Sequence, residues 1–259
     1  MRLHAGSKTN GLMWICRSHC GNSFDPGKHM PIPRIIHQTW KDESIPVPMQ
    51  KLAASWTRHH PCWEYRLWTD TQNRELIKTH YPDFLPRYDS YPSHIQRVDA
   101  VRYFILYTFG GLYVDLDFEC FHSLEPLLSE PECLFGLEPQ EHCEIHNRDC
   151  IIGNALMATA PRHAFFHAII DDLADYNPPP EHRNNVILET TGPFMLTRVY
   201  KRCRSANVTL LPSKYLYPLS LYELEQGAER GWSEVDHQKL REAYALHYFA
   251  GTWWRLGGP

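Results

Sequence analysis

Apolar and polar residues follow two periods along the chain, and their order predicts strands and helices in turn. Residues 34–40, Arg-Ile-Ile-His-Gln-Thr-Trp, form a β-branched and aromatic run that predicts a first strand. Helical spacing over residues 49–59 and alternation over residues 63–68 predict a helix and then a half-buried strand. Strand, helix and strand in this order indicate an α/β sheet.

The clearest helical pattern lies in the middle of the chain. Apolar residues recur three or four apart over residues 93–109, which predicts a helix that Ser93 can cap. Gly110-Gly111 ends this helix, since glycine tolerates the left-handed backbone of a helix end. Residues 112–114 then predict a short strand, after which the polarity changes abruptly at Asp115-Leu116-Asp117.

The second half continues the alternation. Strands are expected over residues 151–158 and 208–211, and helices over 162–176 and from Thr191-Gly192-Pro193 to Arg202. Residues 138–148 and 215–232 are expected to be loops near an acceptor, where Tyr215, Tyr217, Tyr222 and Trp232 either stack on sugar rings or pack the loop. We expect residues 1–30 to be a poorly structured tail and residues 31–259 to form one α/β domain.

Composition and charge narrow the class of protein. The chain has 259 residues, 26 basic and 30 acidic, so its net charge of −4 argues against a dedicated nucleic-acid binder. Its longest apolar candidate, residues 103–113, is too short to span a membrane, and its beginning does not read as a clear signal peptide. The expected location is cytoplasmic or peripheral to a membrane.

The eight cysteines lack the dense spacing of a disulfide scaffold, so free thiols are the favoured interpretation. Five residues that can bind zinc lie close together in the sequence: Cys133, His142, Cys143, His146 and Cys150. Their spacing matches no paired CxxC arrangement, which favours an ordinary loop with buried thiols over a zinc site.

Asp115 and Asp117 are the first candidates for chemistry. In an extended chain, two residues separated by one other point the same way, so these carboxylates can meet on one cation. Such hard oxygen ligands suit Mg²⁺ or Mn²⁺ and leave coordination positions for phosphate oxygens. The competing interpretation is that two exposed carboxylates solvate a turn, which is common for a bare Asp-x-Asp.

Asp99 and Arg102 lie three residues apart on the preceding helix, so they share a face and can pair. If that face borders Asp115, both can also hydrogen-bond sugar hydroxyls. A surface ion pair is the alternative.

These motifs together resemble the family 32 glycosyltransferases, which have a DXD sugar-binding region. The resemblance rests on five segments that run from residue 32 almost to the end of the chain: Ile32-Pro33-Arg34-Ile35-Ile36-His37-Gln38-Thr39-Trp40-Lys41, Arg97-x-Asp99-x-x-Arg102-Tyr103, Gly110-Gly111-Leu112-Tyr113-Val114-Asp115-Leu116-Asp117, Thr191-Gly192-Pro193 and His247-Tyr248-Phe249-Ala250-Gly251-Thr252-Trp253. The family includes α-mannosyltransferases and inositol phosphorylceramide mannosyltransferases. Relatives often carry paired histidines and a serine where this chain has His247-Tyr248 and Thr252.

The resemblance implies a GT-A fold, which is Rossmann-like with a mixed, mostly parallel sheet between helices. It also implies a nucleotide-sugar donor, Mn²⁺ or Mg²⁺, and retention of anomeric configuration. Trp40 would stack on the base or, alternatively, be a core aromatic residue. His247 would be a late metal ligand or, alternatively, a satisfied core histidine. The remaining implied roles are donor sugar for Asp99 and Arg102, ribose and metal for Asp115 and Asp117, and further donor contacts for Tyr113, Asn154 and Trp253.

The expected reaction is hexose transfer from GDP-mannose or a UDP-hexose to a glycan, glycolipid or polysaccharide. Negative charge grows on the departing diphosphate, which a metal ion and Arg102 can stabilise. The alternatives are a nucleotide-sugar hydrolase, a toxin-like transferase with a protein acceptor, and a degenerate, non-catalytic carbohydrate-binding protein.

Overall fold

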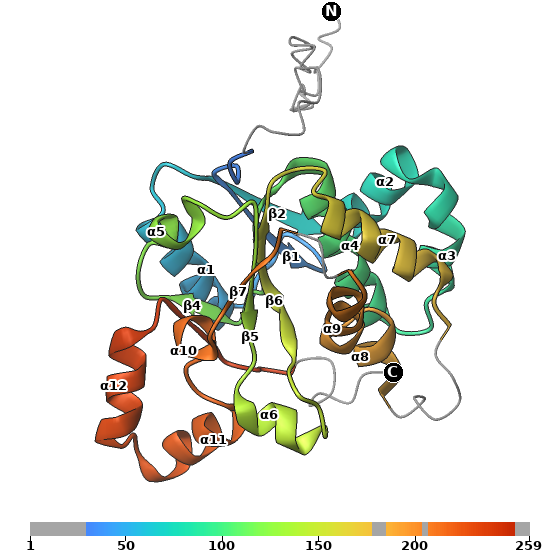
Figure 1. Ribbon diagram of the computed structural model, residues 1–259. Coiled ribbons are helices and arrows are strands. Elements are labelled where there is room, and N and C mark those ends of the chain that lie inside the picture. The colour runs from blue at the N-terminus through green and yellow to red at the C-terminus, as the bar shows by residue number, and fades with distance from the viewer. Residues whose placement is uncertain (1–29, 178–184, 204–206, 252–259) are drawn as a thin grey trace, which may run out of the picture.

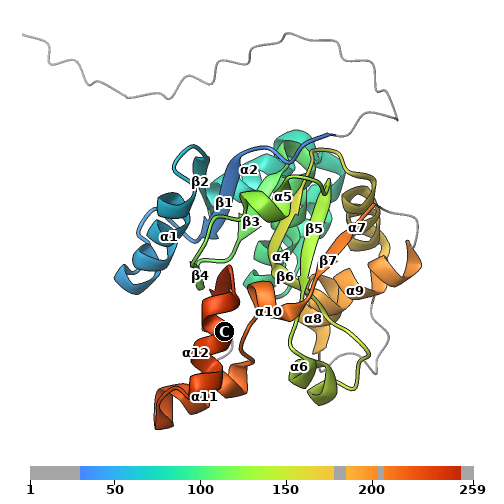
Figure 2. The same cartoon turned by 60° about the vertical axis from the view of Figure 1, so that its left-hand side comes forward.

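A six-stranded sheet forms the centre of the computed structural model, which describes residues 30–177, 185–203 and 207–251. The strand order is β2-β1-β3-β6-β5-β7 (Figures 1 and 2). Strand β6 pairs antiparallel with both β3 and β5, whereas β1 pairs parallel with β2 and β3, and β5 with β7. This arrangement confirms the predicted mixed, mostly parallel sheet. The strands are β1 Ile35–Trp40, β2 Glu64–Thr69, β3 Gly111–Val114, β5 Cys133–Leu137, β6 Ile152–Thr159 and β7 Thr209–Leu211.

Helices cover both faces of the sheet. One apolar cluster joins helices α2, α4, α7 and α9 to one face, and a second joins α1, α10 and the short strands β4 and β8 to the other. Figure 1 shows α4, α7 and α9 on one side and α1, β4 and α10 on the other. The long helices are α1 Val47–His59, α2 Asp70–His80, α4 His94–Phe109, α7 Ala164–Asp175, α9 Pro193–Arg202, α11 Leu221–Arg230 and α12 Glu234–Glu242. The short elements are a 3-10 turn Pro82–Phe84, α3 Leu85–Ser90, β4 Phe118–Cys120, α5 Glu125–Leu128, α6 Gln140–Ile145, α8 Val186–Thr190, α10 Ser213–Leu216 and β8 Ala245–His247.

Helix α4 leads directly into the strand that ends at the Asp-x-Asp motif. Ser93 and Gln96 form a capping box at its start. At its end, Gly110 and Gly111 have φ angles of +65° and +95°. A Cβ on Gly111 would lie 2.6 Å from the carbonyl oxygen of Ile35 on β1, so only glycine allows the two strands to approach this closely.

Most predicted elements are present within a few residues, but the two predicted loops were wrong. Residues 138–148 contain α6, and residues 215–232 contain the end of α10 and all of α11. The Ser220–Glu223 capping box was a signal for α11 that its sparse apolar residues concealed. Tyr217 is 1% exposed, so it packs the core and cannot stack on a sugar ring.

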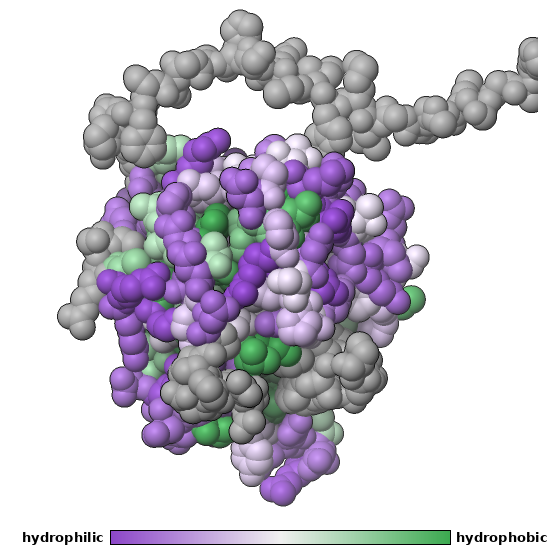
Figure 3. Space-filling view, turned by 90° about the vertical axis from the view of Figure 1, so that its right-hand side faces the viewer, coloured by the Kyte–Doolittle hydropathy of each residue, from purple (hydrophilic) through white to green (hydrophobic). Residues whose placement is uncertain are grey.

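The segment that follows the sheet projects from one end of the molecule. Helices α11 and α12 lie at the same end as α6 in both views (Figures 1 and 2). The main-chain N–H of Leu221 donates to His142 Nε2 (3.1 Å), and Ser220 bonds Glu141, so α6 is fastened to the start of α11. On the α7 side the surface is mostly hydrophilic with small apolar areas (Figure 3).

Several predictions concern features away from the sheet. The predicted tail lies outside the described residues except for Met30, whose main-chain N–H donates to Glu132 (2.6 Å). None of the described helices is long and apolar enough to cross a membrane.

The six described cysteines are free thiols, as expected. The possible zinc grouping does not form, because Cys133 pairs with Thr159 at the opposite end of β5 from α6. His142 instead bonds Glu138, and His146 packs on Phe194.

Candidate active site

The Asp-x-Asp motif lies where the chain turns out of the sheet. Asp115 follows β3, and its main-chain N–H donates to the carbonyl oxygen of Ala155 on β6 (2.8 Å). Phe118 N–H then donates back to the oxygen of Asp115 (3.2 Å), which closes a turn. The expectation that an extended backbone aligns the two carboxylates was therefore wrong. This turn brings Asp115 and Asp117 close together. Its hydrogen bond takes the place of the bonds that a continuing strand would make to its neighbour.

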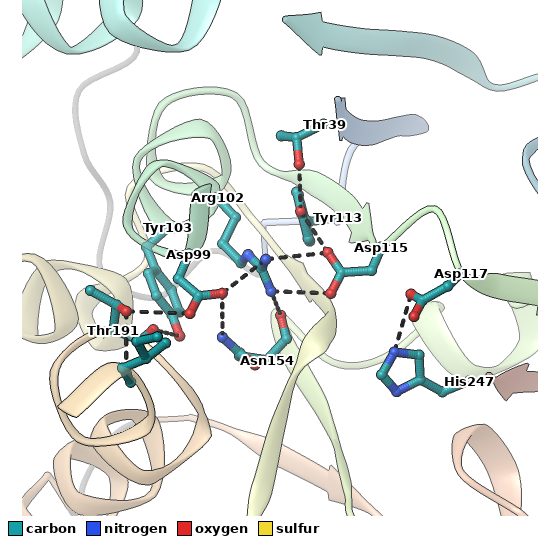
Figure 4. A network of polar contacts seen from close by, with 11 residues as sticks. Thr39, Asp99, Arg102, Tyr103, Tyr113, Asp115, Asp117, Asn154, Thr191 and His247 are labelled. Carbon is teal, nitrogen blue, oxygen red and sulfur yellow. Dashed lines mark hydrogen bonds and ion pairs between the residues drawn. The ribbon is translucent and has the colours of Figure 1, made fainter. Parts of the chain in front are cut away.

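Arg102 is the centre of the polar network (Figure 4). Its Nη2 lies 2.9 Å from Asp99 Oδ1 and 3.3 Å from Asp115 Oδ1, and its Nη1 lies 3.3 Å from Asp115 Oδ2. Nη1 also donates to the carbonyl oxygen of Asn154 (2.9 Å). The Arg102 side chain is 3% exposed, which excludes the surface ion pair that the sequence left open. One guanidinium thus holds a carboxylate from α4 and one from the turn after β3.

Two hydroxyl groups, those of Tyr113 and Thr39, also support Asp115. Tyr113 donates from its phenol oxygen to Asp115 Oδ1 (2.8 Å), and Thr39 on β1 bonds the same phenol oxygen (2.9 Å). The guanidinium of Arg102 lies 4.8 Å from the centre of the Tyr113 ring, within the range of a cation–π contact. Tyr113 is fully buried, and its hydroxyl and ring contact Asp115 and Arg102.

Asp99 is a buried carboxylate with three partners. Arg102 binds its Oδ1, Asn154 Nδ2 donates to the same oxygen (3.4 Å), and Thr191 Oγ1 donates to Oδ2 (3.3 Å). Burial raises the pKa of Asp99 to about 6, against the attraction of Arg102. Burial likewise raises the pKa of Asp115, and the charge of Arg102 opposes that rise. The arginine is therefore the main reason that two neighbouring carboxylates can both ionise.

Asp117 is held by the last described segment of the chain. Strand β8 pairs with β4, which brings His247 beside the motif although 130 residues separate it from Asp117. His247 Nε2 lies 3.2 Å from Asp117 Oδ1, and the main-chain N–H of Ala250 donates to Oδ2 (2.9 Å). Burial would raise the pKa of Asp117, but His247 and the Ala250 N–H outweigh it and lower the pKa to about 2. Asp117 is thus an anion at neutral pH.

The ring of His247 is fixed by aromatic neighbours. It stacks on Phe118, with ring centres 4.6 Å apart, and Phe249 lies 4.1 Å away with a left-handed backbone φ of +46°. Its Nδ1 is buried and has no hydrogen-bond partner among the described residues. A satisfied core histidine would not leave that nitrogen unpaired, so the core alternative for His247 is disfavoured.

Asp115, Asp117 and His247 can hold a metal ion. Each offers one ligand atom, and these atoms all lie within 4.8 Å of one another. Ligands about 2.1 Å from one ion are separated by up to about 4.2 Å, so a shift of about half an ångström would suffice. The Nε2 of His247, which faces Asp117, and the two carboxylates fit a divalent cation, and no other such group occurs in the described part of the chain.

Three further residues were predicted to belong to the site, and one of them contacts the polar network. Trp40 ends β1, and its indole nitrogen is buried with no partner among the described residues, whereas Trp253 lies outside them. Asn154 reaches the network through its side chain and its carbonyl oxygen, as described above. The sequence did not single out Thr39 or the Ala250 N–H as supports. Thr39 lies next to Trp40 in the first segment of the family resemblance, and this position was the signal that could have pointed to it.

Known proteins resemble this chain in sequence and in fold. A family model described as a glycosyltransferase sugar-binding region containing the DXD motif matches residues 46–134. The inositol phosphoceramide mannosyltransferase 3 of Schizosaccharomyces pombe is 39% identical over 173 residues, which cover 67% of this chain and 46% of that protein. The mannosyl phosphorylinositol ceramide synthase SUR1 of Saccharomyces cerevisiae is 35% identical over 234 residues, which cover 87% of this chain and 58% of that protein. The chain spans about half the length of the curated relatives it matches.

Among solved structures, the ligand-free glycosyltransferase domain from the YGT toxin has a TM-score of 0.51 to this chain. The two are 9% identical, and the match covers 83% of this chain and 90% of that domain. At this identity the likeness concerns the fold alone, and it agrees with the predicted GT-A fold. From the family match and the two yeast relatives, the chain belongs to the family 32 glycosyltransferases, whose sugar-binding region contains the DXD motif.

Proposed function

We propose that this chain catalyses metal-dependent transfer of a hexose, with mannose the first candidate, from a nucleotide-sugar donor to a glycolipid acceptor. The observation that carries the proposal is that Asp115 is shared by two sets of side chains. This carboxylate belongs both to the Asp115–Asp117–His247 group and to the network of Arg102 and Asp99. A diphosphate on the first group would place its sugar next to the second.

Asp115, Asp117 and His247 would hold the divalent cation. Two carboxylates and an imidazole favour Mn²⁺ over Mg²⁺, because Mg²⁺ is usually coordinated by oxygen atoms alone. When bound, such an ion acts as a Lewis acid for the departing diphosphate. Asp117 is prepared for this role because its low pKa keeps it ionised, and the Ala250 N–H fixes its second oxygen.

Asp99 and Arg102 would bind the donor sugar. A carboxylate offers about four lone pairs, and three on Asp99 are taken by Arg102, Asn154 and Thr191. One remains for a sugar hydroxyl. The Nε of Arg102 is buried and has no partner among the described residues, so it can donate to the same sugar. Trp40 and Trp253 remain proposed contacts with the donor.

Retention of configuration is proposed from the family resemblance, and the site then favours a front-face displacement over a covalent intermediate. The nearby carboxylates Asp99, Asp115 and Asp117 are each committed to neighbours, so none is free to act as a nucleophile. The acceptor hydroxyl oxygen would form its bond to the anomeric carbon on the face from which the diphosphate leaves. The carbon–oxygen bond to the diphosphate breaks, and the acceptor proton passes to that phosphate.

The donor and acceptor follow from the relatives. Both yeast relatives are named for mannosyl transfer to inositol phosphoceramide, which supports GDP-mannose as the donor and a phosphoinositol lipid as the acceptor. The likeness to a toxin domain concerns the fold alone and so does not favour a protein acceptor.

The purified protein should be incubated with Mn²⁺ and either GDP-mannose, UDP-glucose or UDP-galactose, with inositol phosphoceramide in detergent as the acceptor. We expect a mannosylated lipid from GDP-mannose, with NMR showing the α-anomer of the donor preserved. A β-linked product would contradict retention, and no product with any of these donors would contradict the proposed function.

A further inference from the structure

Helix α8 is a five-residue helix whose polar side chains are more buried than its apolar ones. Glu189 and Thr190 are 4% and 6% exposed, whereas residues 186–188 are only partly buried. A helix this short is not stable by itself, and half-buried apolar residues add little. Polar contacts therefore have to hold α8 in place.

Arg198 on α9 supplies those contacts. Its Nη1 donates to the main-chain oxygen of Glu189 (3.0 Å) and lies 3.4 Å from the carboxylate oxygen Oε2. Its Nη2 donates to Asp172 on α7 (2.6 Å), a carboxylate that is 2% exposed. Arg148 binds the other carboxylate oxygen of Glu189. Buried carboxylates need such partners, so Arg198 joins α8 to α7 through two of them.

The end of α8 continues directly into the site. Thr190 Oγ1 accepts from Gln96 Nε2 (2.8 Å), and Thr191 Oγ1 donates to Asp99 Oδ2 (3.3 Å). The Tyr103 hydroxyl donates to the carbonyl oxygen of Thr191 (3.0 Å). These three partners lie on α4, the helix that also carries Arg102. The position of α8 therefore sets the hydroxyl that orients Asp99 (Figure 4).

We propose that Arg198 is a positioning residue for the donor site: it fixes α8 through Glu189, so that Thr191 holds Asp99 in the orientation that binds the sugar. The inference rests on the proposed function, which assigns Asp99 to the donor. Arg198 acts through Thr191 and not through the donor, so its contribution has to depend on the Thr191 hydroxyl.

The same helix offers a matched control. Arg202 lies one turn further along α9 and binds the other oxygen of Asp172 (3.0 Å), with its side chain 57% exposed. Arg202→Met removes the same charge from the same partner as Arg198→Met. A general loss of charge around Asp172 would affect both variants alike, whereas positioning through α8 affects only Arg198.

The test measures the affinity for GDP-mannose in the presence of Mn²⁺ by calorimetry, in wild type, both arginine variants, Thr191→Val and the double variant. We expect Arg198→Met to weaken binding about tenfold and Arg202→Met less than about twofold. In the Thr191→Val background, Arg198→Met should change the affinity by less than about twofold, because the hydroxyl through which it acts is gone. A full tenfold loss in that background, or equal losses from the two arginine variants, would overturn the proposal.

Two further outcomes are distinguished: a variant that fails to fold, and a wild-type protein that does not bind GDP-mannose. If Arg198→Met is insoluble, Arg198→Lys and Arg202→Lys give the same comparison, because lysine keeps the charge but cannot bridge two carboxylates with a planar fork. Wild-type protein that fails to bind GDP-mannose contradicts the proposed function, and with it the donor role of Arg198. If wild type binds GDP-mannose but the losses of affinity in Arg198→Met and Thr191→Val simply add in the double variant, only the Arg198 inference is contradicted.

Discussion

Replacing Arg102 by methionine tests whether one buried cation holds the site together. The change keeps much of the apolar stem but removes the charge that lies within 3.3 Å of both Asp99 and Asp115. Removing one partner of a buried ion pair costs about 3–5 kcal/mol, because the remaining charge is left uncompensated. For a chain of this size the melting temperature should therefore fall by about 6–20 °C at pH 8.

The loss should depend on pH. The folded-state pKa of Asp99 is about 6, which is already above its unfolded value because of burial, and removing Arg102 raises it further. A carboxyl whose folded pKa exceeds its unfolded pKa stabilises the fold when it is protonated, and this contribution is lost as the pH rises. Above pH 7 the variant should therefore have its greatest deficit relative to wild type, and the deficit should shrink towards pH 5.

Urea denaturation of both proteins at pH 5 and pH 8 measures this directly, since the midpoint and slope give the free energy of unfolding. Arg74→Met is the control, because Arg74 pairs with Asp89 at the surface, with its side chain 50% exposed, and its loss should change the stability little. A deficit in Arg102→Met that is the same at both pH values, or no larger than that of the control, would refute the electrostatic account.

Three further predictions concern other parts of the chain. Burial lowers the pKa of His37 to about 4 in the folded chain. In the unfolded chain His37 becomes protonated near pH 6.5, whereas in the folded chain it stays neutral at that pH. His37 should therefore contribute a loss of about 2 kcal/mol of stability between pH 8 and pH 5, and His37→Gln should remove that part of the pH dependence in urea titrations. A Cβ at residue 153 would lie 2.3 Å from the Tyr217 hydroxyl, so Gly153→Ala should cost about 1–3 kcal/mol, and an equally stable variant would disprove this packing. Trp40→Ala should weaken GDP binding about tenfold in calorimetry if its ring stacks on the base, and unchanged affinity would remove it from the donor site.

Local sequence patterns predicted the parts of the fold that depend on neighbouring residues. The β-branched run before Trp40 became β1, and the three- and four-residue spacing over residues 93–109 became α4. The pairing of Asp99 with Arg102 followed from helical spacing alone. Each of these depends on contacts within one element, which is why one sequence suffices.

Features that depend on long-range contacts could not be derived in this way. Strand β5 is short and buried, with no alternation to mark it, and the helix α8 is held by distant arginines. The turn at Asp115–Asp117 depends on β6 and on the pairing of β4 with β8. The place of His247 beside Asp117 came only from the family resemblance, since 130 residues separate the two.

Metal-dependent catalysis at Asp117 is tested by measuring mannose transfer from GDP-mannose to inositol phosphoceramide by wild type and Asp117→Asn. Each protein is assayed with Mn²⁺ and with EDTA, after melting curves have shown that the variant is folded. We expect transfer by wild type with Mn²⁺, none with EDTA, and a loss of about a hundredfold or more in Asp117→Asn. Transfer by folded Asp117→Asn at the wild-type rate, or wild-type transfer that EDTA leaves unchanged, would show that catalysis does not depend on a metal ion held by Asp117.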